Sequence, residues 1–392
     1  MGSVAIYIAA FVFTAVFTGL AAHYYNLRKG IRQGEAVIGS NDEMRSDVSM
    51  NDVPKLAEKE RRAALAKYVL FFALALFPLF FLTAVRYDVG TDYFYTYVPN
   101  FYRILHGERV YTEYGFYLFN KFIQLFTDDA QWLFVITGFL FAFFFLRTVV
   151  RCSVDPVLSV LALFCTTIYF WSLNNVRQSI AVVLVFAAFP HLLKRHALRY
   201  LIYVFAASLF HITAFGMIVP YIVANLKYVR RYFFFAAIAV VILLPFICNA
   251  AVYMIQLTKY GYYITDPKYN NGVFANREAV ISFLIAGFAF VVLRRRFGRD
   301  RYAYIVTAFQ FMGFLMAAAT FYLGLQEMLL RLMRYFQIFE VLLVPYCINA
   351  IRKFSLRRFL ASSYVIAIGE YAVSVIAVGA HEVIPYKWIF GR

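Results

Sequence analysis

Long apolar runs separated by short basic clusters constrain this chain more than any other feature of its sequence. A helix needs about 20 mostly apolar residues to cross the hydrocarbon core of a bilayer. With 63% apolar and only 15% charged residues, the chain cannot hide its apolar surface in a water-soluble fold. The pattern predicts an all-α, polytopic integral membrane protein whose residues 1–392 form a single membrane domain.

The runs predict about twelve transmembrane helices. They lie near residues 4–22, 66–84, 130–147, 155–172, 176–193, 199–211, 212–226, 231–249, 277–293, 302–320, 331–349 and 359–379. The first run is long enough to span and has no basic residue before it, which favours a helix over a cleavable signal peptide. The runs at 199–211 and 212–226 are short, so they could be tilted, broken or partly buried in protein.

Basic residues give the chain a net charge of +17 and indicate its direction across the membrane. They fall in short clusters between apolar runs, which is typical of membrane proteins and argues against nucleic-acid binding. If the chain starts outside and crosses at each run, 26 of the 38 Lys and Arg residues lie on the inner side. Because cytoplasmic loops carry such an excess, we expect both termini on the outer side.

Three hydrophilic segments separate the runs. Residues 27–65 mix both charge signs with small polar residues, which predicts a flexible linker on the cytoplasmic side. Residues 86–129 and 250–276 are predicted to form large extracytoplasmic loops, where outer-side chemistry is expected. Tyr114–Phe126 is apolar but too short to span, which predicts an amphipathic helix at the interface.

Arginines recur at the outward ends of the predicted helices. Arg177 and Arg277 follow asparagines in a first turn, whereas Arg331 and Arg334 begin a later helix and Arg86 ends the second. A helix N-terminus carries partial positive charge and unpaired N–H groups, so added guanidinium groups make a strong phosphate site. If these ends converge, they form a pocket for a diphosphate. The alternative is that each arginine reaches lipid headgroups separately.

Acid and base candidates on the same side are Asp92, Glu113 and His211. A carboxylate or imidazole that faces a diphosphate-linked sugar can take the proton from an attacking hydroxyl. His211 lies between two short apolar runs, where it could equally tie two helix ends together by hydrogen bonds. Asp88 with Asp92 is the one acidic pair that could hold a divalent cation. Since the outer side has no carboxylate-rich cluster, we expect a reaction without metal or cofactor.

Four sequence elements carry a family resemblance. Residues 86–93 read RYDVGTDY, residues 113–117 read EYGFY, residues 175–181 read NVRQSIA, and Phe210 precedes His211. In this order, between about residues 80 and 345, they resemble the EpsG family of exopolysaccharide polymerases, relatives of the Wzy group. The basic pair at 331 and 334 fits the late arginine region of that family. Tyr114 stands where the family pattern has proline, and the charged segment 28–67 has no counterpart.

The resemblance implies a GT-C-like membrane glycosyltransferase that polymerises undecaprenyl-diphosphate-linked oligosaccharide repeat units into exopolysaccharide, O-antigen or capsule. It implies action on the extracytoplasmic side of the bacterial inner membrane, with a chain-length regulator and a flippase as partner proteins. The diphosphate-binding residues would be Arg86, Arg177, Gln178, Arg277, Arg331 and Arg334. Asp92, Glu113 or His211 would activate the acceptor hydroxyl while the arginines hold the leaving diphosphate.

Two other classes of function stay open. A transporter or flippase of lipid-linked glycans is suggested by Glu340 and Glu370, two carboxylates inside apolar runs. Glu340 fits better as a partner inside the helix bundle than as a proton relay. A membrane ligase or acyltransferase with His211 as its base is the other alternative.

Overall fold

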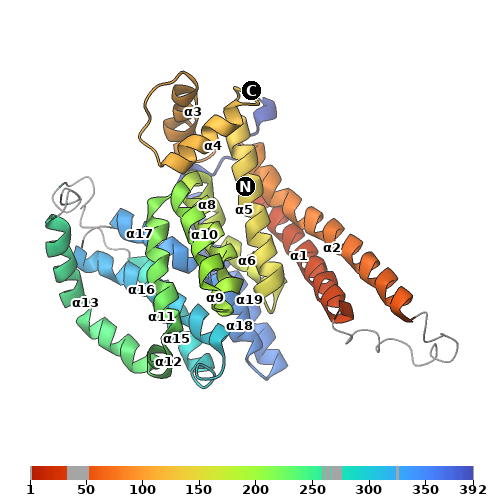
Figure 1. Cartoon of the computed structure of the whole chain (residues 1–392), viewed down its shortest axis with the longest axis vertical. Helices are drawn as coiled ribbons and strands as arrows, with labels where there is room; N and C mark the ends of the chain where they lie inside the picture. Colours follow the sequence, from red (N-terminus) through yellow and green to blue (C-terminus); the bar gives the residue numbers. More distant parts are fainter. Residues whose placement is uncertain are drawn as a thin grey trace.

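The computed structural model describes residues 2–32, 53–257, 261, 266, 276–323 and 326–391 of the chain. Every regular element in these ranges is a helix, which confirms the predicted all-α class. Figure 1 shows the helices packed side by side, with α1 and α2 leaning away from the others on one side.

The first two helices pack along each other and are α1 (Gly2–Arg32) and α2 (Val53–Ala84). Tyr7 and Phe11 of α1 are fully or almost fully buried, and their rings lie 5.0 and 6.3 Å from the ring of Phe170. This end of α1 is therefore anchored in the bundle by aromatic contacts.

A helical cap follows α2 at the upper end of the bundle in Figure 1. Its elements are the π-helix η2 (Tyr93–Tyr97), α3 (Val98–Leu105) and α4 (Tyr114–Gln124). The helix predicted within Tyr114–Phe126 is thus present. Phe116 and Ile123 face the cap interior, whereas Leu118 and Phe122 on the same helix are about half exposed.

The middle of the chain returns from the cap through a series of helices. They are α5 (Gln131–Cys152), α6 (Pro156–Cys165), α7 (Ile168–Asn174), α8 (Val176–Ala187), α9 (Phe189–Leu193), α10 (Ala197–Phe210), the 3-10 helix η3 (Ile212–Met217), α11 (Ile218–Asn225) and α12 (Lys227–Arg231). Asp155 caps α6 by accepting the backbone N–H of Leu158 at 3.1 Å. Thr167, with a φ of 58°, separates α6 from α7, which are bent by 55°.

The last part of the chain completes the bundle and returns to the cap. It contains α13 (Phe233–Gln256), α15 (Asn276–Leu293), α16 (Arg301–Leu323), α17 (Gln326–Gln337), α18 (Glu340–Asn349), α19 (Phe354–Ala377), and the short 3-10 helices η4 (Ala380–Glu382) and η5 (Ile389–Gly391). The Tyr7 hydroxyl donates to the Val383 carbonyl oxygen at 3.0 Å. Segments from the two halves of the sequence therefore meet beside the cap.

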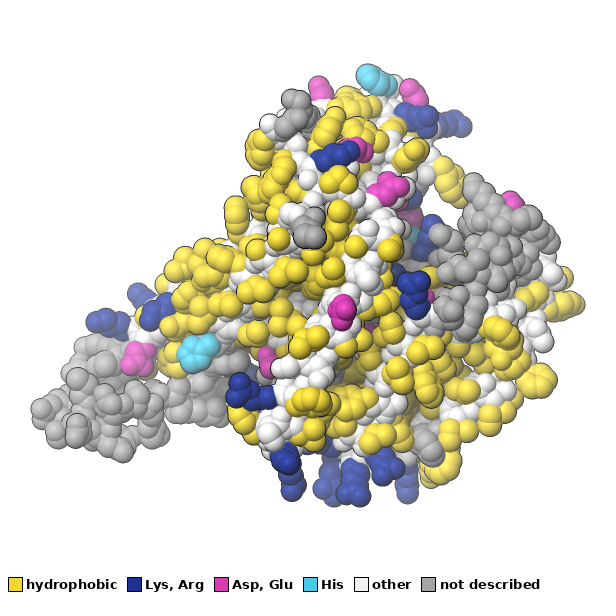
Figure 2. Space-filling model, turned by 180° about the vertical axis from the view of Figure 1, so that it is seen from behind, with side chains coloured by type: hydrophobic (Ala, Val, Ile, Leu, Met, Phe, Trp, Pro, Cys, Tyr) yellow, Lys and Arg dark blue, Asp and Glu magenta, His cyan; other side chains and the backbone are white. Residues whose placement is uncertain are grey.

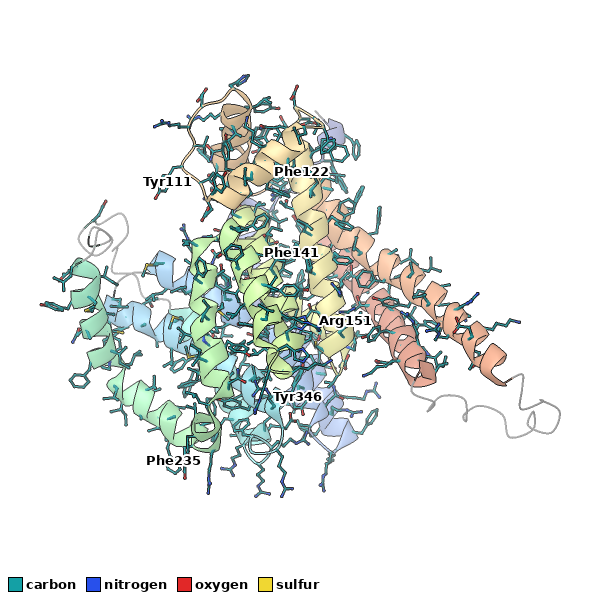
Figure 3. All side chains as sticks on the ribbon, in the orientation of Figure 1. Tyr111, Phe122, Phe141, Arg151, Phe235 and Tyr346 are labelled. Atoms are coloured by element: carbon teal, nitrogen blue, oxygen red, sulfur yellow. The ribbon has the colours of Figure 1, made fainter. Side chains whose placement is uncertain are left out.

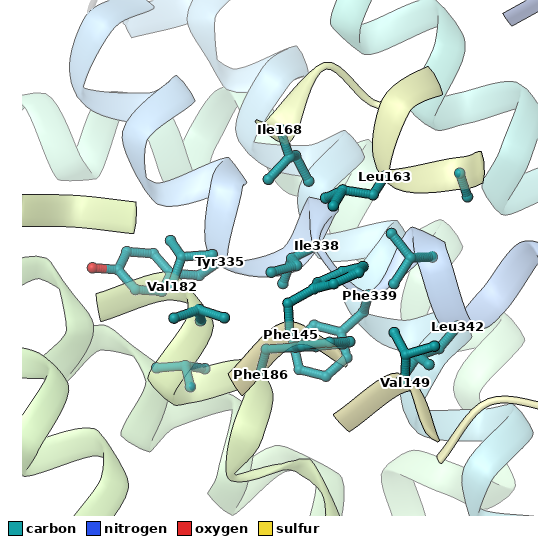
Figure 4. Close-up of a cluster of buried hydrophobic side chains, with 14 of the residues drawn as sticks. Phe145, Val149, Leu163, Ile168, Val182, Phe186, Tyr335, Ile338, Phe339 and Leu342 are labelled. Atoms are coloured by element: carbon teal, nitrogen blue, oxygen red, sulfur yellow. The ribbon is translucent and has the colours of Figure 1, made fainter. Parts of the chain in front are cut away.

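The main core lies where α5, α6, α7 and α8 surround the α17–α18 connection, as Figure 4 shows. The side chains that meet there include Phe145, Val149, Leu163, Ile168, Val182, Phe186, Ile338, Phe339 and Leu342. Tyr335 packs its ring at the edge of this cluster and points its hydroxyl away from it (Figure 4). That hydroxyl is consequently placed for polar contacts outside the core.

The expected count of about twelve spans is not confirmed. Among the described residues, seven helices are long and apolar enough to cross a membrane, or eight if the bent α6–α7 pair is one span. Other predicted spans are short or broken helices in the structure, such as α10, η3 with α11, and α18. Apolar periodicity reports burial but does not separate protein from lipid. In the span Val176–Leu193, 72% of the most apolar window is buried inside the protein, against 11% for Phe354–Ala377.

The predicted hydrophilic segments are only partly described. Of the linker expected at 27–65, residues 27–32 belong to α1 and residues 53–65 to α2, so those parts are helical. Residues 33–52 lie outside the described part. The loop expected at 250–276 begins inside α13, and most of its remainder also lies outside the described residues.

Exposed basic side chains gather at the end of the molecule opposite the cap, as Figure 2 shows at its lower edge. The exposed cations of two predicted inner loops are Arg294, Arg295, Arg296, Arg299, Arg352, Lys353 and Arg358. The two ends of the bundle thus differ in charge. The direction of the chain across the membrane, with both termini outside, stays a prediction.

Candidate functional site

Glu113 immediately precedes α4, where its extended backbone (φ −63°, ψ 141°) lets the helix begin at Tyr114. Two residues later, Gly115 lies against the end of α10. A Cβ atom at Gly115 would stand 2.5 Å from the Leu209 carbonyl oxygen. Because glycine has no side chain, α4 approaches α10 closely enough to place Glu113 next to His211.

Arg177 reaches the same point from the first turn of α8. Its Nη1 atom donates to Glu113 Oε2 at 2.6 Å and to Thr112 Oγ1 at 3.0 Å. The side chains of Arg177 and Glu113 are 29% and 20% exposed. The pair is shielded from bulk water but stays accessible from the surface, so its charges interact more strongly than those of a fully exposed pair.

His211 lies in the connection between α10 and η3, outside the helices that are long enough to span. Its Nδ1 atom is 4.0 Å from Glu113 Oε1 and accepts the backbone N–H of Thr213 at 3.4 Å. Burial lowers the pKa of His211 to about 4; Glu113 opposes this shift, while Arg177 and Arg331 add to it. The imidazole is therefore neutral at pH 7 and carries its proton on Nε2.

Two further contacts connect this group to α17. Thr213 Oγ1 lies 3.1 Å from the Tyr335 hydroxyl, and Gln178 Nε2 donates to the Arg331 carbonyl oxygen at 2.6 Å. We name Glu113, Arg177, His211 and Thr213, with Tyr335 behind them, the Glu113 cluster. Four stretches that are distant in the sequence contribute to it: the residue before α4, the first turn of α8, the start of η3 and α17.

Arg334, one turn after Arg331, lines a cavity of about 310 Å³ on another side of α17. We name this cavity the Arg334 pocket. Its charged and titratable lining residues are Arg277, Glu278, Arg334, Glu340 and His381, with Cys165 and Tyr371. Arg334 is almost fully buried and lies 5.6 Å from the ring centroid of Trp171. Burial lowers the pKa of His381, in η4, to about 4, and Arg334 lowers it further.

Glu340, which also lines this pocket, is 3% exposed and accepts a hydrogen bond from the Tyr364 hydroxyl at 2.9 Å. A buried carboxylate that is hydrogen-bonded to a neighbouring helix holds helices together. This contact supports the interpretation of Glu340 as a partner inside the bundle.

Arg86 lies away from both places. It is fully buried, and its Nη1 donates to the carbonyl oxygens of Val89 and Leu173, the first at 3.1 Å. Its guanidinium lies 4.5 Å from the ring centroid of Phe134. These contacts tie the residues after α2 to the end of α7, and Arg86 exposes no surface to a ligand.

Asp88 and Asp92, which lie in the same segment as Arg86, each contact another side chain. Asp92 Oδ1 accepts the Thr96 hydroxyl at 3.1 Å, and Asp88 Oδ2 lies 2.5 Å from Lys387 Nζ. Neither contact involves the Glu113 cluster. Within the described ranges, no three His, Cys, Asp or Glu side chains come together in a way that could hold a metal ion.

The predicted site residues therefore divide into groups. Glu113, Arg177 and His211 contact each other. Gln178, next to Arg177, is hydrogen-bonded to Arg331 of α17, whose side chain is exposed. Arg277 and Arg334 line the separate pocket, whereas Arg86 and Asp92 contact neither group directly.

Sequence reasoning missed several contributors to these places: Thr112, Trp171, Thr213, Tyr335 and His381. No local pattern marks them, because each acts through contacts that are distant in the sequence.

The model of the EpsG family matches residues 69–388, which include every residue of the Glu113 cluster and of the Arg334 pocket. No curated protein matches the chain, and no solved structure does.

Proposed function

The chain belongs to the EpsG family, and from this premise we propose that it is a membrane glycosyltransferase that polymerises exopolysaccharide. Its substrates would be oligosaccharide repeat units linked to undecaprenyl diphosphate, joined on the extracytoplasmic side of the bacterial inner membrane. Chain-length regulator and flippase proteins are proposed partners, and a GT-C-like fold is the proposed architecture. The observation that carries the proposal is the Glu113–Arg177 ion pair beside the neutral His211.

In the proposed reaction, the acceptor sugar approaches the Glu113 cluster. A hydroxyl oxygen of that sugar forms a bond to the anomeric carbon of the donor, while the bond from this carbon to the diphosphate breaks. The electron pair leaves with the lipid diphosphate, and the hydroxyl proton passes to the Glu113 carboxylate. Oε1 of Glu113 is the atom that would receive it, because Oε2 is held by Arg177. His211 would orient the acceptor by donating from Nε2.

The leaving diphosphate is assigned to the arginines around α17. Arg331 is exposed beside the Glu113 cluster, and Arg334 with Arg277 lines the Arg334 pocket on another side of α17. Guanidinium groups donate bidentate hydrogen bonds to phosphate oxygens and stabilise the negative charge that develops on departure. Glu278 and Glu340 line the same pocket, so the two arginines there also offset nearby carboxylates.

The decisive test uses purified protein in nanodiscs with a lipid-linked repeat unit as donor and acceptor. A polymerase lengthens the glycan and releases free lipid diphosphate, whereas a flippase moves the unit without either product. Mass spectrometry of the product also separates a ligase or acyltransferase, which would modify a different acceptor. Activity in excess chelator tests the expectation that no metal is needed.

Two carboxylate variants compare the site with a matched position. Glu113→Gln should lower the rate of glycan extension by about 100-fold or more, the usual contribution of a general base. Glu108→Gln is the control, since Glu108 forms an exposed ion pair of 3.8 Å with Arg103 in the same cap. Wild-type extension by Glu113→Gln would refute the assigned role of Glu113.

A further inference from the structure

A second basic cavity lies at the lower end of α5, opposite the cap. Its volume is about 220 Å³, and it lies between the end of α5 and the α9–α10 connection. Arg147, Arg151, Lys194, His191, His196 and Arg199 line it. Figure 3 labels Arg151 at this end, whereas Tyr111 and Phe122 mark the cap at the other end. We name this cavity the Arg151 pocket; no part of the proposed reaction uses it.

The positive charge of the Arg151 pocket is not balanced by acidic side chains within the described part of the chain. Among the residues that the structure describes, no acidic side chain lines it. None of its four cations forms an ion pair with a residue that the structure describes. Four positive charges around one small cavity repel each other and create a local field that favours a bound anion.

The imidazole of His191 forms part of the wall of the same pocket. The Nδ1 atom of His191 is inaccessible to solvent and has no hydrogen-bond partner among the described residues. The ring itself is fixed, because it lies 5.6 Å from the Tyr203 ring and 6.2 Å from the His196 ring, centroid to centroid. The ring is therefore a fixed part of the pocket wall, while the four cations supply the attraction for an anion.

We propose that the Arg151 pocket binds the phosphate group of an anionic ligand, at the end of the bundle opposite the polymerisation site. Arginine and lysine side chains pair readily with phosphate oxygens, and a cavity of about 220 Å³ accommodates such a group. Basic pockets between helix ends of membrane proteins bind anionic lipid headgroups in this way. A phospholipid of the surrounding bilayer and a soluble phosphorylated molecule offer the same chemistry, and the test below separates them.

The test compares two double variants with the same change in charge. Arg151→Gln with Arg199→Gln removes two cations from the pocket, whereas Arg352→Gln with Lys353→Gln removes two exposed cations outside its lining. The full-length protein is reconstituted in nanodiscs of phosphatidylglycerol and phosphatidylcholine, and retained lipid is counted by native mass spectrometry after extraction into detergent. In a second arm, inorganic phosphate is titrated onto protein in phosphatidylcholine alone.

The pocket variant should retain about 25-fold less phosphatidylglycerol than the wild type, since each surface cation raises the affinity for an anionic lipid by about fivefold. The control variant should retain as much as the wild type. A pocket-dependent response to inorganic phosphate alone would support the same site with a soluble ligand. Equal behaviour of both variants in both arms would overturn the proposal. If the double variant does not fold, Arg199→Gln alone carries the comparison, because this side chain is exposed.

Discussion

Arg177 and Glu113 are 64 residues apart in the chain, yet Arg177 Nη1 lies 2.6 Å from Glu113 Oε2. The contact joins the first turn of α8 to the residue before α4, so it fixes the cap on the bundle as well as the charges of the candidate site. The same guanidinium holds Thr112 and lies 5.9 Å from the Phe116 ring centroid. Its planar geometry, and not only its charge, is therefore part of the arrangement.

Replacing Arg177 by lysine tests that geometry. Lysine keeps the positive charge but lacks the planar guanidinium that contacts Thr112, Glu113 and Phe116 together. Arg177→Lys should lower glycan extension by about 10-fold or more, measured as release of lipid diphosphate. Arg103→Lys, in the exposed ion pair with Glu108, is the control and should extend glycan normally. Full activity of Arg177→Lys would show that charge alone suffices.

Removing the buried cation of the Arg334 pocket tests diphosphate binding. A hydrogen bond to a charged group contributes about 1.5–3 kcal/mol, so Arg334→Gln should weaken binding of the lipid diphosphate by about 10-fold or more. Arg294→Gln removes an exposed cation at the other end of the bundle and should leave affinity unchanged. Affinity is measured by thermophoresis in detergent. Equal affinities of the two variants would place the diphosphate elsewhere.

The contact between α4 and α10 is tested at Gly115. A methyl group there meets the Leu209 carbonyl at 2.5 Å, so Gly115→Ala must push α4 away and separate Glu113 from His211. Overpacking of this kind costs about 1–3 kcal/mol. We expect a lower unfolding temperature together with reduced polymer. Gly287→Ala, a helical position with nothing within 4 Å, should be neutral or slightly stabilising. Unchanged activity of Gly115→Ala would argue against the need for this spacing.

Acidification should destabilise the protein through His211. Its pKa in the folded chain is about 4, below the usual 6.5, so the unfolded chain binds more protons between these values. The free energy of unfolding consequently falls as the pH drops through this window, by at most about 2 kcal/mol between pH 6.5 and 5. His211→Asn should flatten this slope in denaturant titrations. His106→Asn, at an exposed position in the cap, is the control and should keep the slope.

Part of the candidate site follows from the residue types in the sequence. A basic residue in the first turn of an apolar helix, a glutamate before a short helix and a histidine between two apolar runs are each unusual, so Arg177, Glu113 and His211 stood out. Their mutual contact could not be derived, because it depends on how closely α4 approaches α10 at Gly115. The same limit applies to Arg86. Its sequence position suggested a ligand for phosphate, but tertiary packing surrounds it with carbonyl oxygens and aromatic rings.

The sequence by itself determined the class of protein, since a chain with so many apolar runs can only bury them as helices in a bilayer or in each other. It also located the short helix α4, because Tyr114–Phe126 is an apolar run too short to span a membrane. Only the tertiary structure decided which apolar helices are exposed at the surface of the bundle and which are buried in it. It also decided that α17 separates the Glu113 cluster from the Arg334 pocket. Such outcomes depend on packing between residues that are distant in the sequence, and local hydropathy does not predict those contacts.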